Sequence, residues 1–130
     1  MEVKTNTKEK FHVITVGCAS LTADMAAELS DLLLPYLQND VKNVILNLKE
    51  LQSLDVISAE KLVNLQQIFY ENNSSFVICE MQKGVENFLD SVNLLEMINS
   101  TPTESEAMDI VQMEEIEREM FGPLSPGGET

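Results

Sequence analysis

The sequence predicts an α/β fold, in which a mixed sheet of about four or five strands carries about four α-helices. Short segments rich in β-branched residues alternate with longer segments whose apolar residues recur at helical spacing. The resulting ββαβαβαβα order favours parallel strands joined by right-handed crossovers, and we expect the helices on one face of the sheet. A length of 130 residues with 44% hydrophobic content suits one domain with its own core.

A β-hairpin is expected at the start of the chain. Residues 2–7 and 11–18 supply its strands and residues 8–10 its turn, because the second arm is dense in β-branched residues. His12 lies in that arm without a visible partner. We interpret this histidine as structural rather than catalytic.

A helix over residues 23–38 and a strand over residues 44–48 follow the hairpin. One face of the helix is apolar, formed by Ala26, Leu29, Leu33 and Leu37. Pro35 would clash with the carbonyl of Asp31, so we expect a kink or an early end there. The strand is almost continuously apolar, which predicts a sheet that is covered on at least one face.

The second half of the chain repeats this alternation. A helix is predicted from Asp55 to about Tyr70, with apolar positions at Leu62, Leu65 and Phe69. Residues 72–75 are rich in Asn and Ser and predict a turn before a strand over residues 76–79. A short helix is expected to open at residues 83–84 and to turn Val85, Phe88 and Leu89 inward. Met97–Ile98 is interpreted as a short edge strand.

The last helix has a defined start and an apolar stripe with two possible binding surfaces, the domain itself or a partner. Thr103 and Glu106 match a capping box, which fixes its first turn. Three residues can pack on the sheet: Ala107, Ile110 and Val111. The stripe continues through Met113, Ile116, Met120 and Phe121, which either fold back on the domain or meet a dimer or client partner. The domain is therefore assigned to residues 1–121, and the Pro/Gly-rich residues 122–130 to a flexible tail.

The connection between residues 44–48 and the following helix carries the strongest functional signal. Asp55 stands beside an abrupt helix start, so a carboxylate and free backbone N–H groups meet at one helix N-terminus. Such a corner suits a phosphate group or a protein partner.

This corner resembles the core motif of the STAS family, the domain of bacterial anti-sigma factor antagonists. Asp55, Val56, Ile57 and Ser58 occupy the place of the family's Asp-Ser-Ser-Gly segment. Residues 21–29 resemble the family's entry into its first helix, and residues 103–108 its closing helix. Residues 114–118 are similar to the ending of stand-alone STAS proteins of the Bacteroidota. Asn47 stands where the central strand of the family usually carries Asp.

The resemblance implies a non-enzymatic protein-interaction module that acts in bacterial signalling and transcription regulation. The partner that the resemblance implies is a regulatory protein of the class of kinase-like anti-sigma factors. The expected contact residues are Thr22, Asp24, Asp55, Val56, Ile57, Ser58 and Lys61. The family's phosphate acceptor falls on Ile57, which has no hydroxyl, so binding would be constitutive. Ser58 is either a displaced acceptor or a first-turn serine that bonds the backbone.

Two other classes of function stay open. STAS domains also occur in transport systems, so one alternative is an accessory component of a transport complex. The other alternative is an assembly subunit or homodimer that uses the last helix. An enzyme is disfavoured, because Asp24, Asp55 and Glu60 have no matched catalytic partner. We expect no cofactor and no metal, since one histidine and two separated cysteines offer too few ligands.

Charge and apolar patterning set outer bounds on function. The net charge is −14, and half of it comes from residues 104–130, which hold eight acids and one base. A chain this acidic repels phosphate backbones, so we expect no nucleic-acid partner. No stretch is apolar enough for a signal peptide or membrane span, which predicts a cytoplasmic protein. Cys18 and Cys79 are interpreted as buried, reduced thiols, with a disulfide or metal pair as the alternative.

Overall fold

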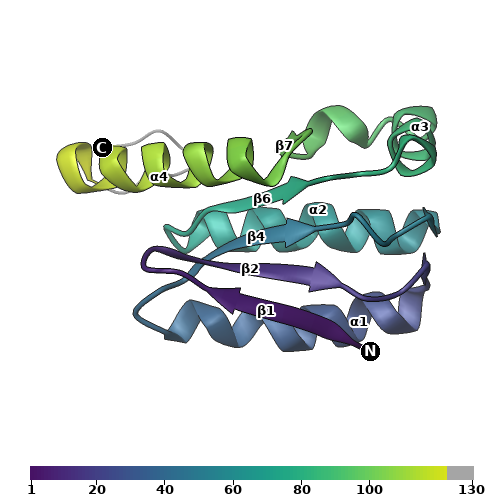
Figure 1. The fold of residues 1–130 in the computed structure, drawn as a ribbon, viewed down its shortest axis with the longest axis horizontal. Helices are drawn as coiled ribbons and strands as arrows, with labels where there is room; N and C mark the ends of the chain where they lie inside the picture. Colours follow the sequence, from purple (N-terminus) through teal and green to yellow (C-terminus); the bar gives the residue numbers. More distant parts are fainter. Residues whose placement is uncertain (123–130) are drawn as a thin grey trace.

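The computed structural model describes residues 1–122 and contains a five-stranded mixed sheet (Figure 1). The strands stand in the order β1-β2-β4-β6-β7, and only β1 is antiparallel to its neighbour. Their bounds are Val3–Thr7 for β1, Phe11–Val16 for β2, Asn43–Asn47 for β4, Phe76–Cys79 for β6 and Ser100–Thr101 for β7. The predicted α/β class and mixed sheet are confirmed. Apart from Gly122, the predicted tail over residues 122–130 lies outside the described residues.

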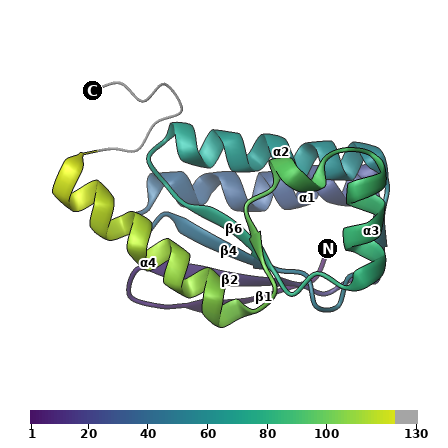
Figure 2. The same ribbon diagram turned by 90° about the horizontal axis from the view of Figure 1, so that it is seen from above.

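Helices cover both faces of this sheet, so the expectation of a single covered face is wrong. The long helices are α1 (Ala23–Leu33), α2 (Val56–Glu71), α3 (Lys83–Ser91) and α4 (Glu104–Phe121). Figure 2 shows α1 and α2 together on one side of the strands and α4 on the other. The cause is visible in β4, where all five residues are buried and successive side chains enter opposite cores.

Two predicted element boundaries can be compared with the structure. The first helix ends at Leu33 and continues as a 3₁₀ turn over Leu34–Gln38 with Pro35 in its first turn, so the expected early end is confirmed. The edge strand predicted at Met97–Ile98 is wrong. Met97 closes a 3₁₀ helix over Leu95–Met97, and Ser100–Thr101 pairs with β6 instead.

The start of α4 is the predicted capping box. The Thr103 hydroxyl accepts from the Glu106 N–H at 3.2 Å, and the Glu106 carboxylate accepts from the Thr103 N–H at 3.3 Å. Ala107 and Val111 are buried against the sheet. The other residues of the predicted stripe are exposed, namely Met113, Ile116, Met120 and Phe121. Within residues 1–122 the stripe therefore does not fold back on the domain.

A polar network that the sequence did not predict fixes the second half of α4. The Arg118 side chain is only 8% exposed, and its Nη2 donates to Asn43 Oδ1, Ser75 Oγ and Glu115 Oε1, each at 3.0 Å. Asn43 also donates to Glu115 at 3.0 Å and to the Lys10 carbonyl at 2.9 Å. Partial burial acts to raise the pKa of Glu115, but hydrogen bonding to Asn43 and Arg118 outweighs burial and lowers this pKa.

A second part of the network joins α4 to α2. Tyr70 donates its hydroxyl proton to Glu114 at 2.8 Å, and Asn99 donates to the Tyr70 oxygen at 2.7 Å. Burial, together with the nearby Glu114 carboxylate, raises the pKa of Tyr70. The orientation of α4 is therefore set by buried polar contacts as well as by apolar packing.

The histidine and the cysteines have structural environments. The Val41 carbonyl can only accept, so the His12 Nε2–H donates to it at 2.9 Å, and His12 Nδ1 lies 2.9 Å from the Thr7 hydroxyl oxygen. Both cysteines are free; Cys79 is buried, while Cys18 is only half-buried. Burial, followed by the Glu104 and Glu80 carboxylates, raises the pKa of Cys79 to about 12, so this thiol stays protonated.

Candidate partner-binding site

The N-termini of α1 and α2 lie side by side. They are joined by a two-stranded parallel ladder, in which β3 (Ser20–Leu21) pairs with β5 (Ser53–Leu54). The Ser20 and Ser53 hydroxyls are 2.9 Å apart. We call this surface the corner and define it as residues 22–24 together with residues 55–61.

Residues that cap the two helices form the polar part of the corner. Asp55 is the N-cap of α2, and its carboxylate accepts from the Ser58 N–H at 2.7 Å. Thr22 caps α1 more loosely, accepting from the Met25 N–H at 3.4 Å. Asp24 follows in the first turn of α1 and is exposed. Two carboxylates therefore stand at two neighbouring helix N-termini, where the helix dipoles favour negative charge.

Hydrogen bonding to Ser58 lowers the pKa of Asp55 below its usual value of 3.8. Because the pKa of Asp55 is lower in the folded state than in the unfolded state, ionised Asp55 stabilises the fold above pH 3.8. This stabilisation is lost as the pH falls through the folded-state pKa. Asparagine is also a good N-cap but does not titrate.

We therefore expect wild type to be more stable than the Asp55→Asn variant at pH 7, with the difference narrowing below about pH 4. Denaturant midpoints of the two proteins, measured at a series of pH values from 7 to 2.5, test this. A difference that stays constant over the whole series would contradict the assigned cause.

Two exposed apolar residues form the apolar part of the corner. Val56 and Ile57 occupy the first turn of α2 and are 41% and 57% exposed. The structure places both side chains on the surface. Lys61, one turn further along α2, is half-buried. Thr22, Asp24, Asp55, Val56 and Ile57 thus share one accessible surface.

Ser58 differs from its neighbours, because its side chain is fully buried. A rotation of about 100° per residue turns position 58 from the surface towards α1. Its hydroxyl donates to the Leu21 carbonyl at 3.0 Å. The same carbonyl receives the Asp55 N–H at 3.4 Å. This is the geometry of a first-turn serine that bonds the backbone.

The corner follows the carboxyl ends of β2 and β4, from which the chain continues into β3 and β5. A cavity of about 330 Å³ lies at the opposite end of the sheet, lined by residues that include Asp40, Lys42 and Arg118. Within residues 1–122, no group of three or more His, Cys, Asp and Glu side chains is placed to hold a metal ion. Among the helices of that same range, none has the length and apolar character needed to cross a membrane.

Sequence reasoning missed the ladder that assembles the corner. Ser20, Leu21, Ser53 and Leu54 form strands of two residues each, which are too short to show any periodicity. The only available signal was the apolar residue at the second position of each pair, and both of these leucines are buried.

Comparison with solved structures identifies the same fold in several proteins. A Thermotoga maritima protein assigned as an anti-sigma factor antagonist has 20% identity and a TM-score of 0.71, over 85% of this chain and 94% of that one. The anti-sigma factor antagonist SpoIIAA in its unphosphorylated form has 15% identity and a TM-score of 0.67, over 86% and 97%. Murine Slc26a9, an anion transporter, has 12% identity and a TM-score of 0.68, over 80% of this chain and 18% of the transporter.

Comparison of the sequence with known proteins gives a family match but no match to an individual curated protein. The model of the STAS domain matches residues 3–107, a range that contains the whole sheet, the corner and the first turn of α4. The chain belongs to the STAS domain family.

Proposed function

We propose that this protein is a non-enzymatic STAS module that binds a protein partner through the corner without a phosphorylation switch at the start of α2. One observation carries the proposal: Val56 and Ile57 are exposed in the first turn of α2, while the only hydroxyl of that turn, on Ser58, is buried. A fold does not specify a function by itself, so the support for this function comes from the exposed residues at the start of α2.

The chemistry of the corner suits a protein surface. Val56 and Ile57 offer an apolar centre, and contacts of this kind dominate binding when they are fully desolvated. Asp24 and Asp55 stand on the rim and favour a partner that presents basic or N–H groups there. Two relatives with this fold are anti-sigma factor antagonists, which supports an anti-sigma factor as the partner class.

The absence of an accessible hydroxyl in the first turn of α2 has a regulatory consequence. Binding would be constitutive, so the fraction of partner that is occupied depends on concentration and affinity alone. If the partner is an anti-sigma factor, a bound complex would keep it from its sigma factor for as long as this protein is in excess. Regulation would then act on the amount of protein.

Site-specific photocrosslinking tests where the partner binds. A photoreactive phenylalanine analogue replaces Ile57 in one protein and Leu32 in another, and crosslinked proteins from the native cells are identified by mass spectrometry. Leu32 is a matched control because it is apolar, 43% exposed and on α1, ten residues beyond its N-cap. The proposal requires a partner captured from position 57 and absent at position 32. The same spectra report phosphate on Ser58, Ser20 and Ser53, and stoichiometric phosphate on Ser58 would contradict an ungated corner.

A second function is supported by the likeness to Slc26a9, which shows this fold within an anion transporter. Under this alternative the chain is an accessory or assembly subunit of a transport complex. The photocrosslinking experiment separates the two functions, because the protein captured from position 57 would then be a transport component rather than a regulator of sigma factors.

A further inference from the structure

The C-terminal half of α4 presents an apolar face that no described part of the chain covers. Met113, Ile116 and Met120 fall within about 60° of one another around the helix axis, and Phe121 follows at the helix end. These four side chains are between 55% and 78% exposed. Leu32 and Met97 are exposed singly, and the only other adjacent exposed pair among the large apolar residues of residues 1–122 is Val56 and Ile57 of the corner. We call the four residues together the α4 stripe.

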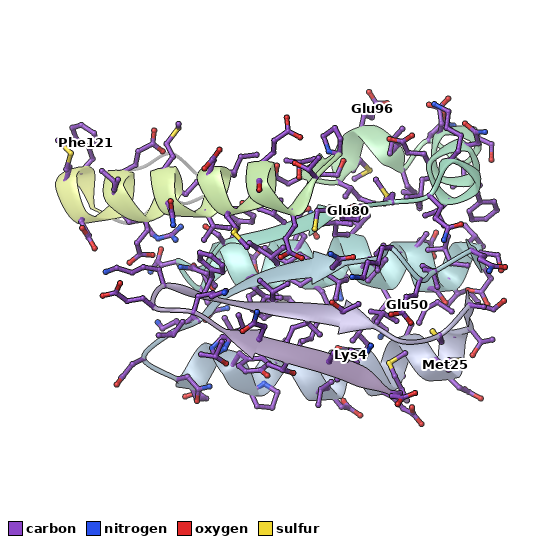
Figure 3. All side chains as sticks on the ribbon, viewed as in Figure 1. Lys4, Met25, Glu50, Glu80, Glu96 and Phe121 are labelled. Carbon is purple, nitrogen blue, oxygen red and sulfur yellow. The ribbon has the colours of Figure 1, made fainter. Side chains whose placement is uncertain are left out.

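The stripe belongs to a rigid platform at the far end of the molecule from the corner. Arg118 anchors this part of α4 to Asn43 and Ser75, so the outward direction of the stripe is fixed before any partner binds. Figure 3 shows Phe121 and Met25 at opposite ends of the fold, Met25 being next to the corner. A partner on the stripe would therefore not compete with a partner on the corner, and no ordering of α4 would weaken its binding.

The charge around the stripe is strongly one-sided. Asp109, Glu117 and Glu119 lie one turn or less from the stripe, while the only basic residue of α4, Arg118, is turned inward against Glu115. Lys10 on the hairpin turn reaches this side, but it is paired with Glu119 at 3.6 Å. Because the α4 stripe is apolar with an acidic border, it is complementary to a partner surface that is apolar with a basic border.

We infer that the α4 stripe is a second docking surface, and that its occupant is a basic amphipathic helix from another protein. A second copy of this chain fits poorly, because stripe-to-stripe contact would bring two sets of α4 carboxylates together. The size agrees, since residues 109–121 span only about 18 Å of helix. A face of that length accommodates one short helix.

Binding of two designed peptides tests the inference. Both are helical 18-residue peptides with the same leucine stripe, and the other positions are lysine in one and glutamate in the other. Fluorescence anisotropy with the full-length protein is expected to show at least about tenfold tighter binding of the lysine peptide. The affinity should fall as salt is raised, because the bordering charges are exposed. Equal binding of both peptides would overturn the charge argument.

Substitutions then locate the site. The Ile116→Gln/Met120→Gln variant is expected to bind the lysine peptide at least about tenfold more weakly, while Leu32→Gln and the corner variant Ile57→Glu bind it like wild type. Circular dichroism and thermal unfolding verify that each variant is folded. Unchanged binding by the stripe variant would overturn the inference, because attraction to general acidity would then explain it. A dimer in analytical ultracentrifugation that the stripe variant abolishes would also overturn it, in favour of a second copy.

Discussion

The Ser58→Glu substitution is expected to lower the free energy of unfolding by about 3–5 kcal/mol, because it places an unpaired carboxylate in a buried site. The Ser58 side chain is 0% exposed and bonds the Leu21 carbonyl, which cannot donate a hydrogen bond to a carboxylate. A loss of this size is a large part of the 5–15 kcal/mol that stabilises a typical domain. Chemical denaturation with a folded-state spectrum of each variant measures it.

Ile57→Glu is the matched control, since it places the same side chain one residue earlier on an exposed helix start. A negative charge in the first turn of a helix is tolerated or favourable, so the free energy of unfolding should change by no more than about 0.5 kcal/mol. Ser58→Ala should cost about 1 kcal/mol through the lost hydrogen bond. Wild-type stability of Ser58→Glu would show that this side chain can leave the core, and Ser58 would again qualify as a phosphate acceptor.

The Arg118→Met substitution is the second change with a large expected effect, a loss of about 2–4 kcal/mol in the free energy of unfolding. The substitution keeps an apolar stem but removes the charge that faces Glu115. It also removes one hydrogen bond each to Asn43 and Ser75. The cost stays below that of a fully buried pair, because Glu115 is 28% exposed. The buried Arg118 Nη1 also lacks a partner among the described residues, and its removal relieves part of the loss.

A double-mutant cycle with Glu115→Gln isolates the ion pair. The two single changes should be less than additive in the double variant, because each removes the same interaction. Hydrogen exchange adds a local measure, in which Arg118→Met is expected to reduce protection in α4 before it does so in β4. Full additivity of the two changes, with α4 protected as in wild type, would contradict the role assigned to this network.

The elements that the sequence predicted well are those with strong local signals. Residues 76–79 are four apolar residues between a polar turn and a helix start, and β6 has these bounds. The Thr103–Glu106 capping box likewise specifies its helix start through two local hydrogen bonds. Pro35 ended the first helix because a missing N–H and a steric clash act within one turn.

The predictions that failed depend on contacts between distant segments. Met97–Ile98 is apolar enough for a strand, but pairing with β6 selected Ser100–Thr101. Helices on both faces follow from the continuous burial of β4, a signal that the apolar run did contain. The outward direction of Ile57 and the inward direction of Ser58 depend on how α2 meets the β3–β5 ladder, and no local pattern encodes that contact.

The measurement that tests the central claim most directly is the affinity of the captured partner for unphosphorylated wild type, Ile57→Glu and Leu32→Glu. An apolar contact that becomes a buried charge should cost at least about 2 kcal/mol, close to a thirtyfold loss of affinity. The account predicts tight binding by wild type and Leu32→Glu, and a loss of this size in Ile57→Glu alone. Equal affinity of all three proteins, or binding by wild type only after a kinase has acted on it, would contradict an ungated corner centred on Ile57.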